Sequence, residues 1–140
     1  MTSNTLLLCF RDQNGYQDVL SQSDLTLVTV ANNTESHRIY DAISYGTVPI
    51  VNDVMSPGNC GKSLTSNVFP LRLLKEYRAP ILYVKDWSEL VNIVENEKKL
   101  LHSEKVKRRR NLLLWYENFK SKLRKKLTTV IAKHFFGVNR

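Results

Sequence analysis

The sequence contains no long hydrophobic segment. It has 140 residues, of which 42% are hydrophobic and 24% are charged, and none of its apolar runs approaches the roughly 20 residues that a membrane-spanning helix needs. The opening ten residues, MTSNTLLLCF, have no basic region and only five consecutive apolar residues, so they do not have the pattern of a secretory signal peptide. We therefore expect a soluble, domain-sized chain with one modest core and without a targeting or anchor segment.

Residues that bind metals or act as nucleophiles are few and scattered. The two cysteines, Cys9 and Cys60, have neither the spacing of a metal site nor a CxxC pattern. The three histidines, His37, His102 and His134, have no partner at metal-ligand spacing, and the sequence shows no Ser-His-Asp or Cys-His arrangement. We therefore predict no metal site, and the catalytic residues of any enzyme function stay unknown.

Glycine-rich phosphate loops are also missing. No Gly-x-Gly-x-x-Gly pattern follows a predicted strand, so a dinucleotide site of the usual kind is not supported. The segment GNCGKS, residues 58–63, ends like a P-loop, but Ser56 occupies the position of the first glycine of that motif. We therefore do not predict an NTPase, and we interpret Lys62 as part of a surface loop.

Apolar runs alternate with amphipathic stretches along the chain. This alternation predicts an α/β fold, with a parallel sheet that has helices on both faces. Asp86 and Glu89 have the spacing of a capping box, Gly46 falls where a helix end favours a left-handed residue, and Pro49 suggests a strand at the sheet's edge or a local interruption of the ladder. The predicted strands are 5–10, 25–30, 47–51 and 80–84, and the predicted helices are 16–24, 35–45, 70–77, 86–101 and 103 to about 136.

Acidic residues are nearly absent from the last third of the chain. Residues 1–97 carry seven Lys or Arg against eleven Asp or Glu, whereas residues 98–140 carry fourteen against two, so a slightly acidic body has a tail of net charge +12. The tail has an apolar stripe at helical spacing, which favours a helix that packs on the fold and leaves its basic face in solvent. The stripe is formed by Leu112, Trp115, Tyr116, Phe119, Leu123, Leu127, Val130 and Ile131.

Two other kinds of partner can be considered for this tail. Its basic face could attract nucleic acid or an anionic membrane surface, although the aromatic residues lie on the apolar stripe and are not interleaved with the lysines for base stacking. We therefore expect no nucleic acid partner. An apolar stripe that nothing covers would instead favour a homodimer.

The segment TESHRIYDAISYGTVPIVND, residues 34–53, places charged residues at the start of a helix between two apolar strands. In a parallel sheet, ligands bind beyond the carboxyl ends of the strands, and a helix N-terminus there offers N–H groups to a phosphate. Arg38 can add a bidentate contact to a diphosphate, and Asp41 shares its face of the helix and can accept hydrogen bonds from ribose hydroxyls. The alternative is an i,i+3 surface salt bridge between Arg38 and Asp41 on an ordinary helix.

The segment SDLTL…NTESHRIYDAISYGTVPIVNDVMSPGNCG resembles the donor-binding half of exostosin-like glycosyltransferases. The resemblance continues through LRLLKEYRAPILYVKDWSEL and RRRNLLLWYENFKSKL, and so covers nearly all of the chain after about residue 23. It implies a Rossmann-like domain that forms the C-terminal half of a GT-B glycosyltransferase. It also implies UDP-xylose-dependent transfer of xylose to ribitol phosphate, in the synthesis of O-mannosyl glycans of the α-dystroglycan type.

The same resemblance implies roles for residues around the start of the helix. Asn33, Thr34 and Glu35 would lie at the helix N-terminus beside the nucleotide sugar, Arg38 would hold its diphosphate, and Asp41 would hold its ribose. Asp41 stands where the family pattern leads us to expect a glutamate, and its side chain is shorter by one methylene group.

The remaining expectations concern the sugar, the acceptor and the compartment. Asp53 would face the sugar, although nothing identifies it as the catalytic base. We expect no cofactor or metal beside the donor substrate, an acceptor glycan bound by an N-terminal domain that this chain lacks, and a location in the Golgi lumen.

We divide the chain into a donor-binding domain, residues 1–100, and a basic helical segment, residues 101–140, that packs back on it. By itself such a fragment is expected to bind donor without turning it over. The alternative from another class is a non-catalytic α/β module whose basic helix binds polyanions.

Overall fold

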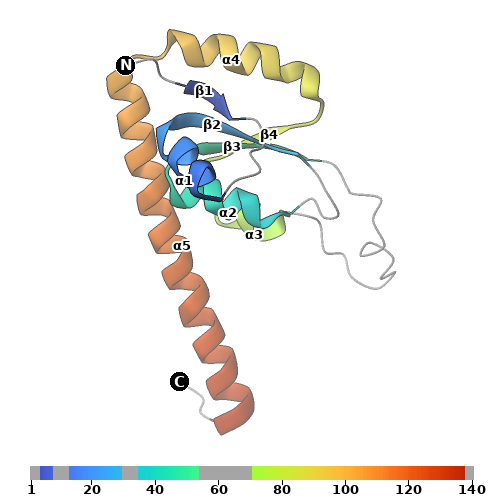
Figure 1. The fold of residues 1–140 in the computed structure, drawn as a ribbon. Coiled ribbons are helices and arrows are strands. Elements are labelled where there is room, and N and C mark those ends of the chain that lie inside the picture. The colour runs from blue at the N-terminus through green and yellow to red at the C-terminus, as the bar shows by residue number, and fades with distance from the viewer. Residues whose placement is uncertain (1–3, 8–12, 30–34, 54–70, 138–140) are drawn as a thin grey trace.

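The fold is a four-stranded parallel sheet with helices on both faces and a long helix at one end (Figure 1). A computed structural model describes residues 4–7, 13–29, 35–53 and 71–137. In chain order its elements are β1 (Asn4–Leu7), α1 (Gln13–Gln22), β2 (Ser23–Val28), α2 (His37–Ser44), β3 (Val48–Asn52), α3 (Arg72–Glu76), β4 (Leu82–Val84), a 3-10 turn (Trp87–Glu89), α4 (Leu90–Lys99) and α5 (His102–Phe136).

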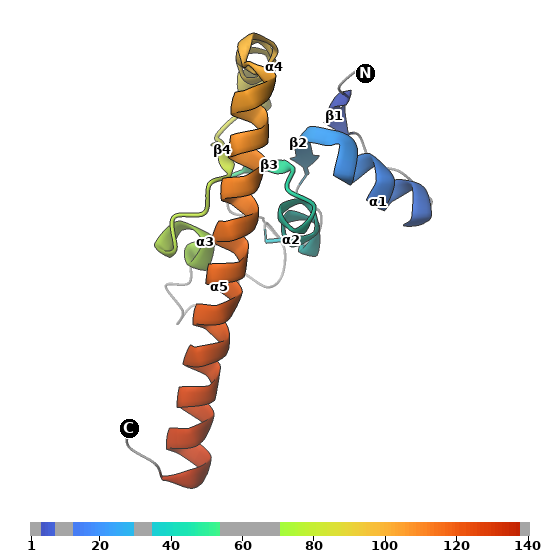
Figure 2. The same ribbon diagram turned by 90° about the vertical axis from the view of Figure 1, so that its left-hand side faces the viewer.

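The strands lie in the order β1-β2-β3-β4, and every neighbouring pair is parallel. Helices α1 and α2 contact one face of the sheet and α4 contacts β1 from the other face (Figures 1 and 2). This arrangement confirms the predicted α/β class with a Rossmann-like parallel sheet. Parallel strands that are covered on both faces need apolar residues throughout, which accounts for the β-branched runs in β2 and β3.

The core lies between the sheet and its helices. Residues of β2, β3 and β4 pack there against the inner face of α2, which contributes Ile39 and Ile43, both fully buried. One polar pair lies inside this core, where the hydroxyl groups of Thr26 and Thr47 are 2.8 Å apart and satisfy each other. The inner face of α2 thus fixes which of its side chains point toward solvent.

One helix and one strand differ from the prediction. The predicted helix 16–24 starts earlier, at Gln13, and ends at Gln22. It ends there because Ser23 begins the pairing of β2 with β1, and the Ser23 hydroxyl donates to the carbonyl of Val19 at 2.6 Å. The edge position that Pro49 suggested for its strand is wrong, since β3 lies between β2 and β4. Pairing with β4 starts only at Ile50, so the N–H that proline lacks deprives β4 of no hydrogen bond.

The turns that end and begin helices agree with the prediction. Gly46 follows α2 with a φ of 74°, and a Cβ atom there would lie 2.6 Å from Cγ of Arg109. Glycine is therefore required both for the left-handed conformation and for the close approach of α5. The predicted capping box is present, because the Asp86 carboxylate accepts from the N–H of Ser88 at 2.8 Å and the Glu89 carboxylate accepts from the N–H of Asp86 at 3.1 Å.

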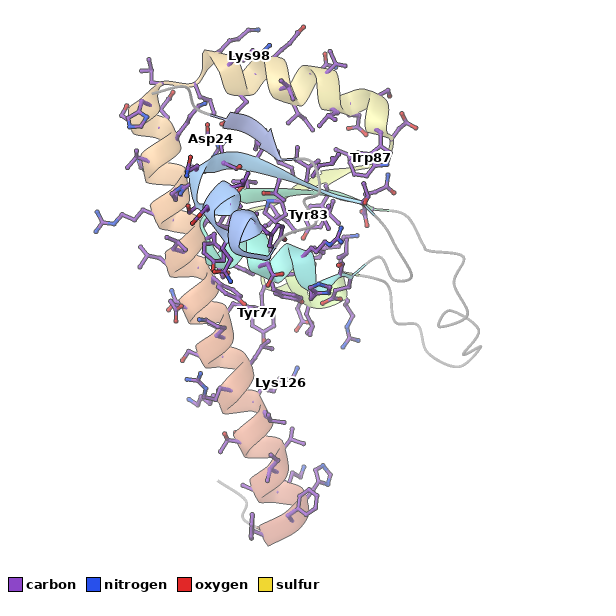
Figure 3. All side chains as sticks on the ribbon, viewed as in Figure 1. Asp24, Tyr77, Tyr83, Trp87, Lys98 and Lys126 are labelled. Carbon is purple, nitrogen blue, oxygen red and sulfur yellow. The ribbon has the colours of Figure 1, made fainter. Side chains whose placement is uncertain are left out.

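The long helix α5 packs on the fold over only part of its length. Leu112 and Phe119 are buried, and the indole N–H of Trp115 donates to the carbonyl of Tyr77 at 2.9 Å. Beyond Leu123 the helix extends away from the sheet, as Lys126 shows in Figure 3. The predicted packing does not reach the end of the stripe, because the body of the fold does not extend that far. The exposed large apolar residues there are Leu127, Val130, Ile131, Phe135 and Phe136.

No helix within the described residues combines the length and the hydrophobicity that a membrane-spanning helix needs. The division of the chain into residues 1–100 and 101–140 stays a prediction.

Candidate functional site

The candidate site lies along the side of the sheet that is formed by the carboxyl ends of its strands (the carboxyl edge). Helix α2 starts on this side after β2, Asp53 directly follows β3, and β4 ends at Val84 (Figure 1). The N–H of Asp53 donates to the carbonyl of Val84 at 2.8 Å, which extends the pairing of the two strands by one residue. Carboxyl ends of parallel strands are the usual ligand-binding edge of such folds.

The first turn of α2 presents polar groups to solvent at this edge. Ser36 caps the helix, and its hydroxyl accepts from the N–H of Arg38 at 3.3 Å. Because Ile39 and Ile43 hold the opposite side of the helix in the core, the Arg38 side chain is exposed, and Asp41 is half-buried one turn further on. No ion pair joins Arg38 to Asp41 within the part of the chain that the structure describes, so the alternative interpretation, a surface salt bridge between these two residues, is wrong.

Glu35 is held in place by a tyrosine of α2. The hydroxyl of Tyr40 donates to the Glu35 carboxylate. The centre of the Tyr40 ring lies 6.5 Å from the centre of the Phe119 ring in α5. Burial and the neighbouring Glu35 carboxylate raise the pKa of Tyr40 far above its usual value, so the hydroxyl keeps its proton. Glu35 is thereby fixed at the start of α2 by a contact that depends on the packing of α5.

An ion pair lies across the ends of β3 and β4. The ammonium of Lys75, on α3, is 2.6 and 2.8 Å from the two carboxylate oxygens of Asp53. The same ammonium lies 5.6 Å from the centre of the Tyr83 ring. Side chains from the end of β3, from α3 and from β4 therefore meet at this point of the edge.

Tyr83 connects this ion pair with the start of α2. Burial, and after it the negative charges of Asp53 and Glu35, raise its pKa to about 12. Its ring lies on the side of the sheet that α2 covers (Figure 3). Its hydroxyl oxygen is buried and has no hydrogen-bond partner among the described residues. One side of the edge thus contains the neutral hydroxyl of Tyr83, the Asp53 carboxylate that pairs with Lys75, and the Glu35 carboxylate that Tyr40 holds in place.

The structure brings together four of the predicted site residues, and the other two lie outside the described part of the chain. Glu35, Arg38 and Asp41 lie at or near the start of α2, and Asp53 lies at the end of β3. Asn33 and Thr34 fall in the residues that are not described, as do Cys9, Cys60 and Lys62.

Three residues near the carboxyl ends of the strands, Tyr40, Lys75 and Tyr83, were not predicted from the sequence as part of the site. Tyr83 is the penultimate residue of a strand whose carboxyl end faces the site, and this position was a usable signal. Tyr40 and Lys75 gave no such signal, because their roles depend on contacts between α2, α3, α5 and the ends of the strands.

A metal site can be considered only for the described residues. Among them, no group of three or more His, Cys, Asp or Glu is placed to hold a metal ion. Whether transfer requires a metal is a separate question, and our expectation that it does not stays a prediction.

Residues 10–136 match the family model described as the RXYLT1 C-terminal domain. The chain is 47% identical over 125 residues to ribitol-5-phosphate xylosyltransferase 1 of Homo sapiens, and 46% identical over 125 and 123 residues to the proteins of that name from Mus musculus and Danio rerio. These alignments cover 88–89% of this chain but only 28% of each relative. No solved structure matches. The relatives are glycosyltransferases by name, which confirms the resemblance to such enzymes, and the family model covers most of the sequence; the chain belongs to the RXYLT1 C-terminal domain family.

Proposed function

We propose that this chain binds a nucleotide sugar, UDP-xylose, at the carboxyl edge of its sheet, and that it is the donor-binding part of an enzyme that transfers xylose to ribitol phosphate. The observation that carries this proposal is the exposed Arg38 in the first turn of a capped helix at that edge. The names of the relatives support the choice of xylose and ribitol phosphate. The uridine nucleotide follows from the family resemblance.

The chemistry proposed for this edge is stabilisation of a leaving group. Negative charge builds on the diphosphate as its bond to the sugar breaks, and N–H groups at the start of α2 together with the Arg38 guanidinium are suited to bind that charge. Asp41 lies one turn along the same helix, where its carboxylate can accept hydrogen bonds from the ribose. The base that takes the proton of the acceptor hydroxyl is assigned to no residue of this chain.

The wider setting is part of the same proposal. The chain spans 28% of the length of the relatives it matches. We assign the binding of the acceptor, a ribitol phosphate on an O-mannosyl glycan of the α-dystroglycan type, to the remainder of a longer protein. The Golgi lumen, as the compartment, follows from the family resemblance.

Arg38→Ala tests the diphosphate site directly. The Kd for UDP should increase about 10- to 100-fold, because charge-assisted hydrogen bonds contribute about 1.5–3 kcal/mol each. Isothermal titration calorimetry on the 140-residue chain measures it, with Arg110→Ala as the matched control, since Arg110 is an exposed arginine of α5. Circular dichroism checks that both variants are folded. An unchanged Kd in Arg38→Ala would contradict the role of this residue.

Ligand choice is tested by saturation-transfer NMR with UDP-xylose and, as the control ligand, ATP. We expect signals from the uracil, ribose and xylose protons and none from ATP. If the folded chain gives no signal from either nucleotide, the proposed donor site is wrong.

One observation favours a second function, the binding of polyanions. The projecting part of α5 exposes Arg124, Lys125, Lys126 and Lys133, and it carries no acidic residue after Glu117. Binding of a polyanion by such a surface should weaken steeply between about 50 and 200 mM salt, because counterions are released. The Kd for a nucleotide in a pocket should change far less, so a salt titration separates the two functions.

A further inference from the structure

We propose that the Asp53–Lys75 ion pair and the hydroxyl of Tyr83 form the subsite for the hydroxyl groups of the donor sugar. This inference rests on the proposed function and adds to it a place for the sugar, separate from the place of the diphosphate. It is carried by three features of the described residues: the charge balance of the pair, its fixed position, and a buried hydroxyl without a partner.

The ion pair offers hydrogen bonds to a sugar without attracting phosphate. Asp53 and Lys75 lie 2.6 Å apart and their charges cancel, so the pair adds little net field at the diphosphate. Their side chains keep 29% and 43% of their surface exposed, respectively. Carboxylate oxygens retain lone pairs and the ammonium retains an N–H after they bind each other. Neighbouring hydroxyls of a sugar, which both donate and accept, match such a pair.

The position of the pair is fixed by contacts on each side. Asp53 is held by the backbone hydrogen bond to Val84. Lys75 lies beside Leu74, which is fully buried and anchors α3 in the core, and its ammonium is held near the Tyr83 ring. A binding group that is ordered before the ligand arrives loses less conformational entropy on binding.

The Tyr83 hydroxyl lacks a hydrogen bond that a ligand can supply. Its oxygen is buried and has no partner among the described residues, although a buried hydroxyl without a partner costs free energy. Because its pKa is about 12, it is a neutral donor and acceptor at physiological pH. Its neighbours, the carboxylates of Asp53 and Glu35, are the groups whose charges act on it most strongly after burial. The Lys75 ammonium lies 5.6 Å from the centre of the Tyr83 ring, so we place the sugar hydroxyl that binds the ion pair on the Tyr83 side of it.

Stability gives no competing reason for the pair. Partly exposed ion pairs contribute little to the free energy of unfolding, because solvent screens the charges and two long side chains must be ordered. The variants Asp53→Asn, Lys75→Met and Tyr83→Phe should therefore fold with nearly unchanged Tm. Tyr83→Phe removes a hydroxyl that has no partner, so its Tm should be equal to or higher than that of the wild type.

The test compares UDP with UDP-xylose by calorimetry on the 140-residue chain. Each of the three variants should weaken UDP-xylose binding about 5- to 20-fold, the loss of one hydrogen bond with or without a charged partner, and leave the Kd for UDP within about twofold. Lys98→Met is the matched control, because Lys98 is an exposed lysine that points away from the sheet on α4 (Figure 3). In saturation-transfer NMR, the xylose signals of Lys75→Met should weaken relative to the uracil signals.

The outcomes separate this subsite from the donor site itself. Equal losses for UDP and UDP-xylose in Lys75→Met would overturn the proposal by placing the lysine at the diphosphate. If none of the three variants weakened the binding of either ligand, the Asp53–Lys75 pair would have only a structural role, and this result would also overturn the proposal. Both of these results leave the proposed function intact, whereas a folded wild-type chain that binds neither ligand contradicts the proposed function itself.

Discussion

Replacing Glu97 by alanine should lower the free energy of unfolding by about 3–5 kcal/mol, the range expected when one partner of a buried ion pair is removed. The Glu97 side chain is 4% exposed and receives two hydrogen bonds of 2.6 Å from the guanidinium of Arg108. Lys105 lies 3.5 Å from the same carboxylate. Without Glu97, Arg108 keeps a partly buried charge that no other described residue pairs with.

Chemical denaturation measured by circular dichroism gives the free energy of unfolding for this comparison. Glu117→Ala is the matched control, because Glu117 is 71% exposed and its ion pair with Lys120 lies on the surface of α5. This control should change the free energy by less than about 0.5 kcal/mol. The double variant Glu97→Ala/Arg108→Ala should recover part of the loss, since it removes the charge that is left alone. A loss of 1 kcal/mol or less in Glu97→Ala would contradict the stabilising role assigned to the ion pairs that Glu97 forms with Arg108 and Lys105.

The ion pairs of Glu97 with Arg108 and Lys105 belong to a set of contacts that join α5 to parts of the fold far from the candidate site. Lys105 also binds the Asp24 carboxylate at 2.9 Å, at the start of β2. Arg109 donates to the carbonyls of Ser21 and Ser23 at the same end of the sheet. Because the candidate site lies at the opposite ends of the strands, Glu97→Ala should not change the Kd for UDP of the molecules that remain folded. Stability and ligand binding are thus separable at this end of the fold.

The sequence was sufficient to predict the parts of the fold that depend on local patterns. The β-branched run of β2, the cap that starts the helix at Asp86 and the left-handed Gly46 each follow from chemistry within a few residues, and the structure confirms them. The start of α2 at the carboxyl ends of the strands followed from the order of strand, loop and helix. Arg38 and Asp41 could therefore be named before any distance was known.

The contacts that complete the site could not be predicted in this way. The partner of Asp53 is Lys75, which is 22 residues away in sequence, and no spacing rule joins two such positions. The role of Tyr40 depends on Phe119 of α5, and the interior position of Pro49 depends on the order of the strands. The apolar stripe of α5 is continuous in sequence, so the periodicity carries no sign that its packing ends near Leu123.

Phe119→Ala should also lower the free energy of unfolding by about 3–5 kcal/mol, the usual range for removing a buried phenylalanine ring. Phe119 is 3% exposed. Its ring stacks on Trp115 with 4.9 Å between ring centres and 14° between planes, and meets the edge of Tyr77 at 5.3 Å and 80°. Phe135→Ala is the matched control, because Phe135 is 79% exposed on the same helix, and it should change stability by less than about 0.5 kcal/mol. Equal stability of the two variants would contradict this packing.

Phe119 differs from Glu97 in what its loss should do to ligand binding. The Phe119 ring packs against Tyr40, and the Tyr40 hydroxyl holds the Glu35 carboxylate at the start of α2. Removing the ring frees Tyr40 to move, so the groups around the start of α2 are less well ordered before the ligand arrives, and some of that disorder must be removed on binding. We therefore expect Phe119→Ala to weaken UDP binding severalfold under conditions where the protein is folded, and Glu97→Ala to leave it unchanged. If both variants lose the same stability and neither loses affinity, α5 supports the fold but does not help to order the site.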